Sequence, residues 1–337
     1  MDIALDLGTS NTRVCVENGG KVIDAPSVIV HDQLTNEIIA YGDIAYKMLG
    51  RTSARYEVVF PLDSSVIAQS GLVEELVNIF LCEVCKSRVV MPRVLACIPG
   101  EITEVEKRAI VNAISSFGVR RVLLLESAKA AAFGSGINIM SPHGNMVIDM
   151  GAGSVDIAVM TLGGVSVGKT LKIAGNAMDD EIIKYVRRQH NLIIGKAMAK
   201  SCKEAIGTVS YENDDKVFRV KGRDAVRGLP KFIDIKSSEI MEVIFDIAKD
   251  IAIAIGDVLE DTPPELLSDI HTDGITITGG LSKLKGMREL IENATNMKVH
   301  IPKDPEDAVV RGLYKAIDYI DEAEAERNSL NPLMMVY

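Results

Sequence analysis

Two aspartates occupy equivalent places in two similar stretches of the chain. Asp6 lies near the end of the first apolar run of IALDLGTSNTRVCV (residues 3–16), and Asp149 lies likewise in VIDMGAGSVDIAVM (residues 147–160). Each precedes a glycine by two residues, and a turn of small or hydroxyl-bearing residues follows. Such turns offer backbone N–H groups to phosphate oxygens with little steric bulk. A carboxylate repels a phosphate unless a divalent cation lies between them, so the pattern favours Mg²⁺ held by Asp6 and Asp149 through its waters.

A third glycine turn, TITGGLSK (residues 276–283), bears on this interpretation. Either aspartate alone could equally cap a turn with a purely structural purpose. The third turn follows an expected strand and precedes an expected helix, where the backbone can lie against a base or an α-phosphate. The three turns together favour a nucleotide, with residues 8–11 and 151–154 gripping its phosphate tail.

The motif D-x-G, a polar turn and a second strand occur twice, which indicates two related halves. If the halves face each other, their strand ends meet at one interdomain cleft, which is the usual place for a ligand in such folds.

The elements that must position these residues follow from hydrophobic periodicity. Strands and helices alternate, which is typical of an α/β protein. One helix start is marked by a capping box, because Glu106 follows Thr103 by three residues. We expect strands at 3–7, 12–17, 21–30, 93–99, 121–127, 274–280 and 298–302, a hairpin between 145 and 175, and helices at 71–84, after 103, at 128–136, within 176–207, at 239–259, after 286 and from 306.

The length and composition indicate a globular protein of two domains. The chain has 337 residues and is 47% hydrophobic, with a mean hydropathy of +0.17. Charges interrupt its apolar stretches, so none is predicted to span a membrane. The chain enters a strand directly after Met1, which leaves no room for a signal peptide, and we expect a cytoplasmic location.

Charge and cysteine content narrow the possible partners. The formal net charge of −10 argues against general affinity for nucleic acids. Five cysteines at scattered spacings are expected to be buried free thiols, since no second pair or nearby histidine completes a metal site with CEVC (residues 82–85).

The motifs DLGTSNT, DMGAG and TGG, in this order, resemble the actin, Hsp70 and sugar-kinase ATPase superfamily. The stretches PGEITEVEKRAI, GRDAVRGLPK, TPPELLSDI, LGRT and NLIIG are similar to one branch, the bacterial actin MreB family, and the similarity runs from residue 2 to about 320. The resemblance implies an actin-like ATPase fold with two related ribonuclease-H-like domains around a nucleotide cleft. The first large domain would comprise residues 1–30, 62–143 and 305–325 with a small subdomain at 31–61, and the second 144–180 and 237–304 with a small subdomain at 181–236, followed by a tail at 326–337.

The resemblance also implies a function. It implies ATP- and Mg²⁺-dependent assembly into paired filaments on the inner face of the cytoplasmic membrane, acting in cell shape and the positioning of wall synthesis. The implied partners are further copies of the chain, the anionic membrane surface, membrane proteins of the wall-elongation complex and MreB paralogues, with no nucleic acid. A non-hydrolysing scaffold for a paralogous filament, or a small-molecule kinase or chaperone-type ATPase on the same fold, remain as alternatives.

The resemblance assigns site residues position by position, with four substitutions. Ser10 replaces a usual Ala, and Lys200 replaces a usual Glu. Ala152 and Leu281 each replace a usual Gly. The implied nucleotide-binding residues are Gly8, Thr9, Ser10, Asn11, Thr12, Gly151, Ala152, Gly153, Lys200, Lys203, Glu204, Gly279, Gly280, Leu281 and Ser282.

Two further departures concern catalysis. The family's EEPLAAAIG is ESAKAAAFG here, so Ser127 occupies the place of the water-activating Glu. Its GGGTTE is GAGSVD, so Val155 occupies the place of a water-orienting Thr beside Asp149. A serine hydroxyl is a poor base, and valine cannot hydrogen-bond a water. Glu126 is adjacent, but a one-residue shift at a strand end turns a side chain to the other face. We therefore expect weak or absent hydrolysis.

Two segments remain. CKSRVVMPR (residues 85–93) resembles the membrane-entering loop of MreB proteins, with apolar residues Val89, Val90 and Met91 between the cations Lys86, Arg88 and Arg93. The alternative is a loop folded against its own domain. The terminal PLMMVY (residues 332–337) is too short to span a membrane, and we expect a frayed end.

Overall fold

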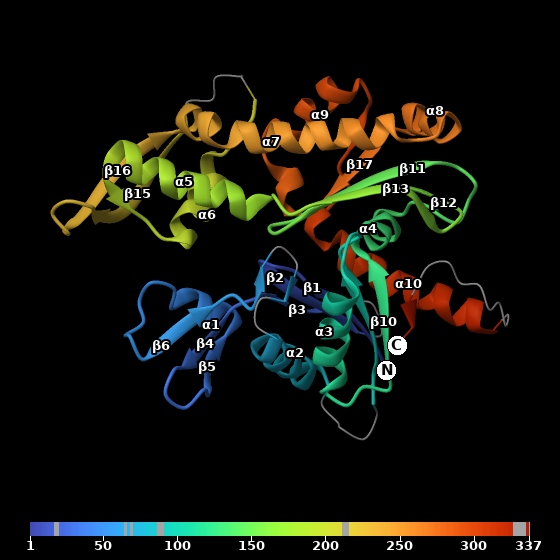
Figure 1. The fold of residues 1–337 in the computed structure, drawn as a ribbon, viewed down its shortest axis with the longest axis horizontal. Helices are drawn as coiled ribbons and strands as arrows, with labels where there is room; N and C mark the ends of the chain where they lie inside the picture. The colour runs from blue at the N-terminus through green and yellow to red at the C-terminus, as the bar shows by residue number, and fades with distance from the viewer. Residues whose placement is uncertain are drawn as a thin grey trace.

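The computed structural model describes residues 1–16, 20–63, 66–67, 70–85, 91–210, 216–325 and 335–336. The chain forms two halves, one above the other in Figure 1, each built on its own large sheet. Each half extends on the same side, at the left of the view, into a smaller lobe.

The first large sheet has the strand order β19-β10-β9-β1-β2-β3. Its centre is the hairpin of β1 (Asp2–Leu7) and β2 (Asn11–Val16), which β3 (Gly20–Pro26) extends as a third antiparallel strand. On the other side of β1 lie β9 (Arg93–Ile98) and β10 (Arg121–Glu126), both parallel to their neighbours.

The second large sheet repeats this plan. Its order is β13-β12-β11-β17-β18, with β11 (Asn145–Met150), β12 (Val155–Thr161) and β13 (Gly164–Leu171) as the antiparallel strands. The strands β17 (Ile275–Thr278) and β18 (Val299–His300) run parallel on the other side of β11. β11 therefore corresponds to β1, and the expected duplication is confirmed in the sheets.

Helices cover both faces of the first sheet. The outer face packs against α2 (Ser70–Val84) and α3 (Glu104–Ser115), and Ile3 and Leu5 of β1 point into that core. Ala4 points to the opposite face, as the period of two in a strand requires, towards α4 (Ser127–Ser135) and α10 (Ala308–Ala325). The α4–α10 core also contains residues of β11 and β12, so these two helices lie between the two sheets.

The crossing of α4 and α10 requires glycine. A Cβ at Gly134 would collide with the backbone carbonyl of Ala308, and one at Gly312 would collide with that of Ala130. The helix backbones therefore touch directly, which brings the two halves close together.

The second half has one large core. It is built from β11, β12 and β17 together with α5 (Gly175–His190), α6 (Lys196–Ile206), α7 (Ser237–Glu260) and α9 (Met287–Thr295). The helix α8 (Pro264–Asp273) packs beside β11.

Each small lobe contains a three-stranded sheet. The first has β4 (Ile29–Asp32), β5 (Ile38–Tyr41), β6 (Tyr56–Val59) and the short α1 (Gly42–Lys47). The second has β14 (Leu192–Ile193), β15 (Val217–Asp224) and β16 (Pro230–Lys236). The remaining short elements are β7 (Leu62–Asp63), β8 (Val66–Ile67), η1 (Gly280–Lys283), η2 (Pro305–Asp307) and β19 (Met335–Val336).

Several expectations can be checked directly. The Thr103–Glu106 capping box is present, and all five cysteines are free thiols. The expectation that all five are buried is wrong for Cys82, which is exposed on α2. The expectation of a frayed end is wrong for Met335 and Val336, because β19 pairs antiparallel with β10 and covers its edge. No helix among the described residues has the length and hydrophobicity that a membrane span requires.

Candidate functional site

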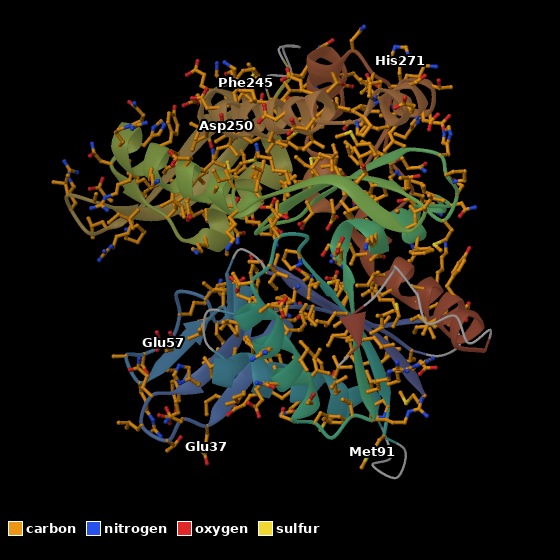
Figure 2. The ribbon with its side chains drawn as sticks, turned by 45° about the vertical axis from the view of Figure 1, so that its right-hand side comes forward. Glu37, Glu57, Met91, Phe245, Asp250 and His271 are labelled. Carbon is orange, nitrogen blue, oxygen red and sulfur yellow. The ribbon has the colours of Figure 1, made fainter. Side chains whose placement is uncertain are left out.

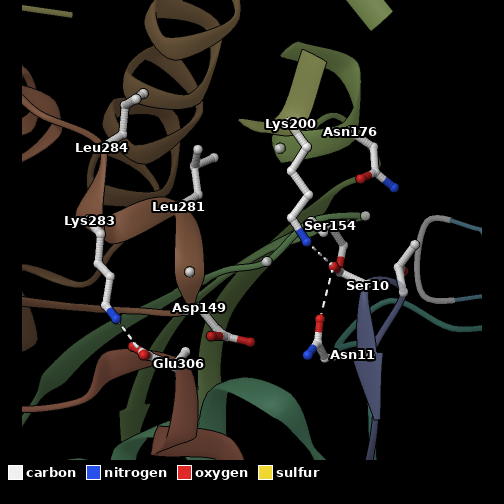
Figure 3. A pocket seen from close by; sticks show the side chains of 18 of the residues that line it. Ser10, Asn11, Asp149, Ser154, Asn176, Lys200, Leu281, Lys283, Leu284 and Glu306 are labelled. Carbon is white, nitrogen blue, oxygen red and sulfur yellow. Dashed lines mark hydrogen bonds and ion pairs between the residues drawn. The ribbon is translucent and has the colours of Figure 1, made fainter. Parts of the chain in front are cut away.

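The two aspartates meet at one cleft between the halves. Asp6 is next to last in β1 and Asp149 is next to last in β11, so both lie at the carboxyl ends of corresponding strands. Both carboxylates line a cleft of about 700 Å³ to which both halves contribute. The cleft is shown from close by in Figure 3, with Asp149 below Leu281 and opposite Ser10.

The first turn joins β1 to β2. Only glycine fits at position 8, because a Cβ there would lie 2.6 Å from the carbonyl oxygen of Asn11. Gly8, Thr9, Ser10 and Asn11 line the cleft. Thr12 does not: it is fully buried, and its hydroxyl lies 2.9 Å from that of Ser27, which donates to the Gly8 carbonyl. Thr12 therefore supports the turn from behind.

The second turn joins β11 to β12. It is closed by the Gly151 N–H, which donates to the Ser154 carbonyl at 2.9 Å. Gly151, Ala152, Gly153 and Ser154 all line the cleft.

The third turn follows β17. Gly279 has φ +80°, and a Cβ there would collide with the Met150 carbonyl and lie 2.9 Å from Asp149 Oδ1, so only glycine fits. Gly280 and Leu281 line the cleft. Ser282 is buried outside the lining, and its hydroxyl donates to the Gly279 carbonyl at 2.7 Å, which fixes the turn.

Burial and neighbouring charges shift the pKa values of both carboxyl groups. Burial, and then the charges of Asp156 and Asp6, raise the pKa of Asp149 to about 7, against a hydrogen bond of 2.9 Å from the Thr278 hydroxyl. Burial also raises the pKa of Asp6, although Arg13 and a hydrogen bond from the Cys97 thiol act in the opposite direction.

Two facing carboxyl groups with raised pKa values suit a cation. No cluster of three His, Cys, Asp or Glu residues that could hold a metal occurs in the described part of the chain, so the side chains alone do not form a closed metal cage. Two carboxylates that leave room for waters and phosphate are the donor set typical of Mg²⁺. The residues therefore fit the expected ion.

A network of charges supports Asp6 from the side. Arg13 lies opposite Asp6 in the β1–β2 register, 3.7 Å from its carboxylate, and reaches Asp307 at 3.2 Å and Asp24 at 3.5 Å. Lys21 contacts Asp24 and Asp307 at 3.0 Å each. This network joins the β2–β3 hairpin to the 3₁₀ turn before α10.

Helix α6 brings three expected residues to the cleft. Lys203 pairs with Asp179 at 2.9 Å and donates to the Gly175 carbonyl, and Glu204 also lines the cleft. Lys200 donates to the Ser10 hydroxyl at 2.8 Å, across the cleft (Figure 3).

The site has further residues that the sequence patterns did not indicate. Some lie just beyond the glycine turns and others come from segments without a glycine motif. Asp179 is an acid one turn into a helix that proves to be buried. The lining residues in question include Arg13, Cys97, Asp156, Gly175, Asn176, Asp179, Lys216, Lys283, Lys285 and Glu306.

The comparisons with known proteins agree with this geometry. A family model described as MreB/Mbl protein matches residues 1–325. The chain belongs to the MreB/Mbl family. It is 36% identical over 322 residues to the cell shape-determining protein Mbl of Bacillus subtilis (95% of this chain, 97% of that protein) and 35% identical over 326 residues to MreB of Escherichia coli K12 (95% and 94%).

Solved structures of MreB proteins show the same fold. MreB5 of Spiroplasma citri bound to ADP matches with a TM-score of 0.90 and 34% identity, over 96% of this chain and 98% of that one. A MamK double helical filament matches with a TM-score of 0.79 at 20% identity, over 94% and 99%, and shares the fold. The resemblance to bacterial actins and the actin-like α/β fold are both confirmed.

Of the two departures from the MreB pattern that concern catalysis, one faces the cleft and one does not. Ser127 lines the cleft at the start of α4, and its hydroxyl donates to the Ile98 carbonyl at 3.0 Å. Glu126 lies outside the lining, 3.5 Å from Lys129. Val155 is fully buried in the core of the second half, whereas its neighbour Ser154 lines the cleft and bears a hydroxyl. Of the two residues, only Ser127 is placed where it could act on a water.

The segment compared with the MreB membrane loop lies partly outside the described residues, which exclude Val89 and Val90. Met91 is described and is 60% exposed, and its side chain lies at the lower edge of the molecule in Figure 2. The expectation that Arg93 belongs to a surrounding group of cations is wrong, because its side chain is buried and donates to Asp2 at 2.9 Å.

The raised pKa of Asp149 predicts a pH dependence of stability without Mg²⁺. The unfolded chain releases this proton near pH 3.8 and the folded chain near 7, so the free energy of unfolding falls as pH rises through that window. Asp149→Asn removes the penalty, so we expect the variant to melt above the wild type at pH 8, with the difference much smaller at pH 4.5 and lost only below pH 3.8.

Thermal melting at the two pH values in a chelating buffer measures this. Asp246→Asn, an exposed acid on α7, serves as the control and should show no such difference. A gap between Asp149→Asn and wild type that is constant with pH, or wider at low pH, contradicts the prediction.

Proposed function

We propose that this chain binds ATP with Mg²⁺ in the cleft and assembles into actin-like filaments that act in cell-shape determination. The observation that carries the proposal is the meeting of three glycine turns around Asp6 and Asp149 in one cleft. The proposal is supported by the relatives named as cell shape-determining proteins, and by the S. citri MreB5 structures with ADP and with AMPPNP.

In this proposal each group of cleft residues has its own task. Asp6 and Asp149 would hold Mg²⁺ through its waters, which neutralises the phosphate charge when the ion is bound. The turns at residues 8–11 and 151–154 would donate N–H groups to the phosphate tail, and the turn at 279–281 would face the nucleoside. Lys203, held by Asp179, would lie on the nucleoside side.

Assembly is the readout that separates this function from a kinase on the same fold. With Mg²⁺ and ATP we expect long, paired filaments in electron micrographs, because nucleotide joins both halves in one geometry. The double variant Asp6→Ala, Asp149→Ala loses the metal site and should give none. Single particles of wild type under ATP, ADP and nucleotide-free conditions alike would contradict the proposal.

We further propose that hydrolysis is weak, which makes a scaffold that holds its nucleotide the second candidate. The proposal is supported by Ser127, whose hydroxyl donates its proton to a backbone carbonyl and is a poor base at neutral pH. Asp156 also lines the cleft, but it accepts hydrogen bonds from the Thr170 hydroxyl at 2.6 Å and the Gly100 N–H at 3.0 Å. These two hydrogen bonds occupy one carboxylate oxygen of Asp156, which therefore has a structural role.

Restoring a carboxylate at position 127 tests this reasoning. We expect Ser127→Glu to raise phosphate release by roughly 10²-fold or more, since general-base assistance is worth about 10²–10⁴-fold. Ser127→Gln has the same length and no basic group, so it should remain at the wild-type rate. The proposal of weak hydrolysis is refuted if the wild type releases phosphate as fast as E. coli MreB measured alongside and if Asp149→Ala abolishes that release.

We also propose a peripheral location at the inner face of the cytoplasmic membrane. The proposal is supported by the exposure of Met91 and by the sequence around it, in which Val89 and Val90 follow Lys86 and Arg88. Each cation near an anionic surface contributes about 1 kcal/mol. One loop binds weakly, and a filament multiplies the contact.

Liposome pelleting with assembled protein tests the loop. Wild type should pellet with anionic vesicles and not with zwitterionic ones, and Val89→Ser, Val90→Ser should remain in the supernatant. Val105→Ser is the matched control, because it removes a 78% exposed valine from α3 in the same domain. Equal pelleting of the loop variant and the control would contradict the assignment.

A further inference from the structure

One face of α6 carries three lysines. Lys196, Lys200 and Lys203 are four and three residues apart, so they share a face of the helix. Their ammonium groups reach different targets: Lys203 contacts Asp179, and Lys196 lies over the Phe60 ring at 6.0 Å. Lys200, between them, is the one whose target lies in a phosphate-type turn.

Lys200 joins elements that are far apart in the sequence. It belongs to the second half, donates to the Ser10 hydroxyl at 2.8 Å in the first half, and lies 5.9 Å from the centre of the Tyr46 ring on α1. Its side chain descends from α6 to Ser10 in Figure 3. An extended lysine therefore crosses the cleft directly above the first turn.

The ammonium group of Lys200 differs from the neighbouring cations in the kind of group it contacts. Arg13, Lys203 and Lys283 in the cleft each pair with a carboxylate. Within the described ranges, Lys200 forms no ion pair, and its hydrogen-bond acceptor is a neutral hydroxyl. Ser10 donates in turn to Asn11 at 3.1 Å, whose amide donates to Asp24 at 3.0 Å.

We propose that Lys200 is a phosphate ligand that distinguishes a nucleoside triphosphate from a diphosphate. This assignment rests on the proposed function and gives the same site a sensor of phosphate charge. The Lys200 ammonium group exchanges the Ser10 hydroxyl for an oxygen of the phosphate tail. Both hydrogen bonds have the charged ammonium as donor, but the phosphate oxygen also carries a negative charge, so the exchange adds an attraction between opposite charges and is favourable. A triphosphate carries more negative charge at this end of the cleft than a diphosphate does, so it gains more binding free energy from the exchange.

Calorimetric titration of ATP and ADP, each with Mg²⁺, tests the assignment. Lys200→Met keeps the aliphatic stem beside Tyr46 and removes the charge. We expect its ATP affinity to fall by about 10-fold or more, as for a lost hydrogen bond to a charged group, while its ADP affinity changes by less than about 3-fold. Lys200→Glu should lose more ATP affinity, through repulsion. Lys196→Met, one turn away on the same face, should alter neither nucleotide by more than about 3-fold.

Each outcome has a separate meaning. Unchanged binding of both nucleotides by Lys200→Met, or an equal loss of both, would overturn the assignment, because a residue that only shapes the cleft does not discriminate between them. Thermal melting without nucleotide confirms that each variant is folded. If the wild type binds neither nucleotide, the proposed function itself fails. If the wild type binds both and Lys200→Met matches it, the role of Lys200 alone fails.

Discussion

The burial of two carboxyl groups in one cleft is the constraint on which this site depends. Asp6 and Asp149 lie at the ends of corresponding strands in different halves, and burial raises the pKa of both. The charge of Asp6 adds to the raised pKa of Asp149, so ionisation in the first half carries a cost in the second. A divalent cation bound at both carboxylates would offset these penalties together. Because its two carboxylates come from separate sheets, charge balance in the cleft is coupled to how the halves sit together.

The distance between those strand ends is set beneath them by α4 and α10. The two helices lie between the sheets, and Gly134 and Gly312 let their backbones touch. The core they form includes Leu95 of the first sheet and Val147 of the second, so the halves share a hydrophobic interior instead of meeting only at the ligand. A side chain at either glycine would force the helices apart and widen the cleft above them.

Features written in local sequence could be predicted, and features made by distant contacts could not. The D-x-G repeat, the three glycine turns and the Thr103 capping box each depend on residues a few positions apart, and each lies where expected. The pairing of Arg93 with Asp2 depends on the parallel register of β1 and β9, and the pairing of β19 with β10 joins residues over 200 positions apart. Neither can be inferred from hydrophobic periodicity.

The placing of Val155 was accessible in principle and was missed. It begins β12, so the alternation of side chains sends it into the core and leaves Ser154, the last residue of the turn, in the lining of the cleft. Thr12 is the equivalent case in the first half: it is the second residue of β2 and faces Ser27 instead of the cleft. In both halves the motif identifies the turn correctly, and the first inward-facing residue of the next strand belongs to the core.

In the proposed function, the cleft separates the chemistry of binding from that of turnover. Its acids and glycine turns would hold metal and phosphate, whereas the position expected to activate a water carries Ser127, whose hydroxyl donates to the Ile98 carbonyl. On the proposed function, a nucleotide bound without turnover acts as a structural cofactor that joins the two halves. Ligand at 100 times its dissociation constant stabilises the form that binds it by about 2.7 kcal/mol, and this stabilisation persists for as long as hydrolysis does not remove it. An assembly built from such subunits would be regulated by nucleotide exchange rather than by hydrolysis within the filament. The discrimination proposed for Lys200 matters more in such an assembly, because affinity rather than hydrolysis then decides which nucleotide occupies the cleft.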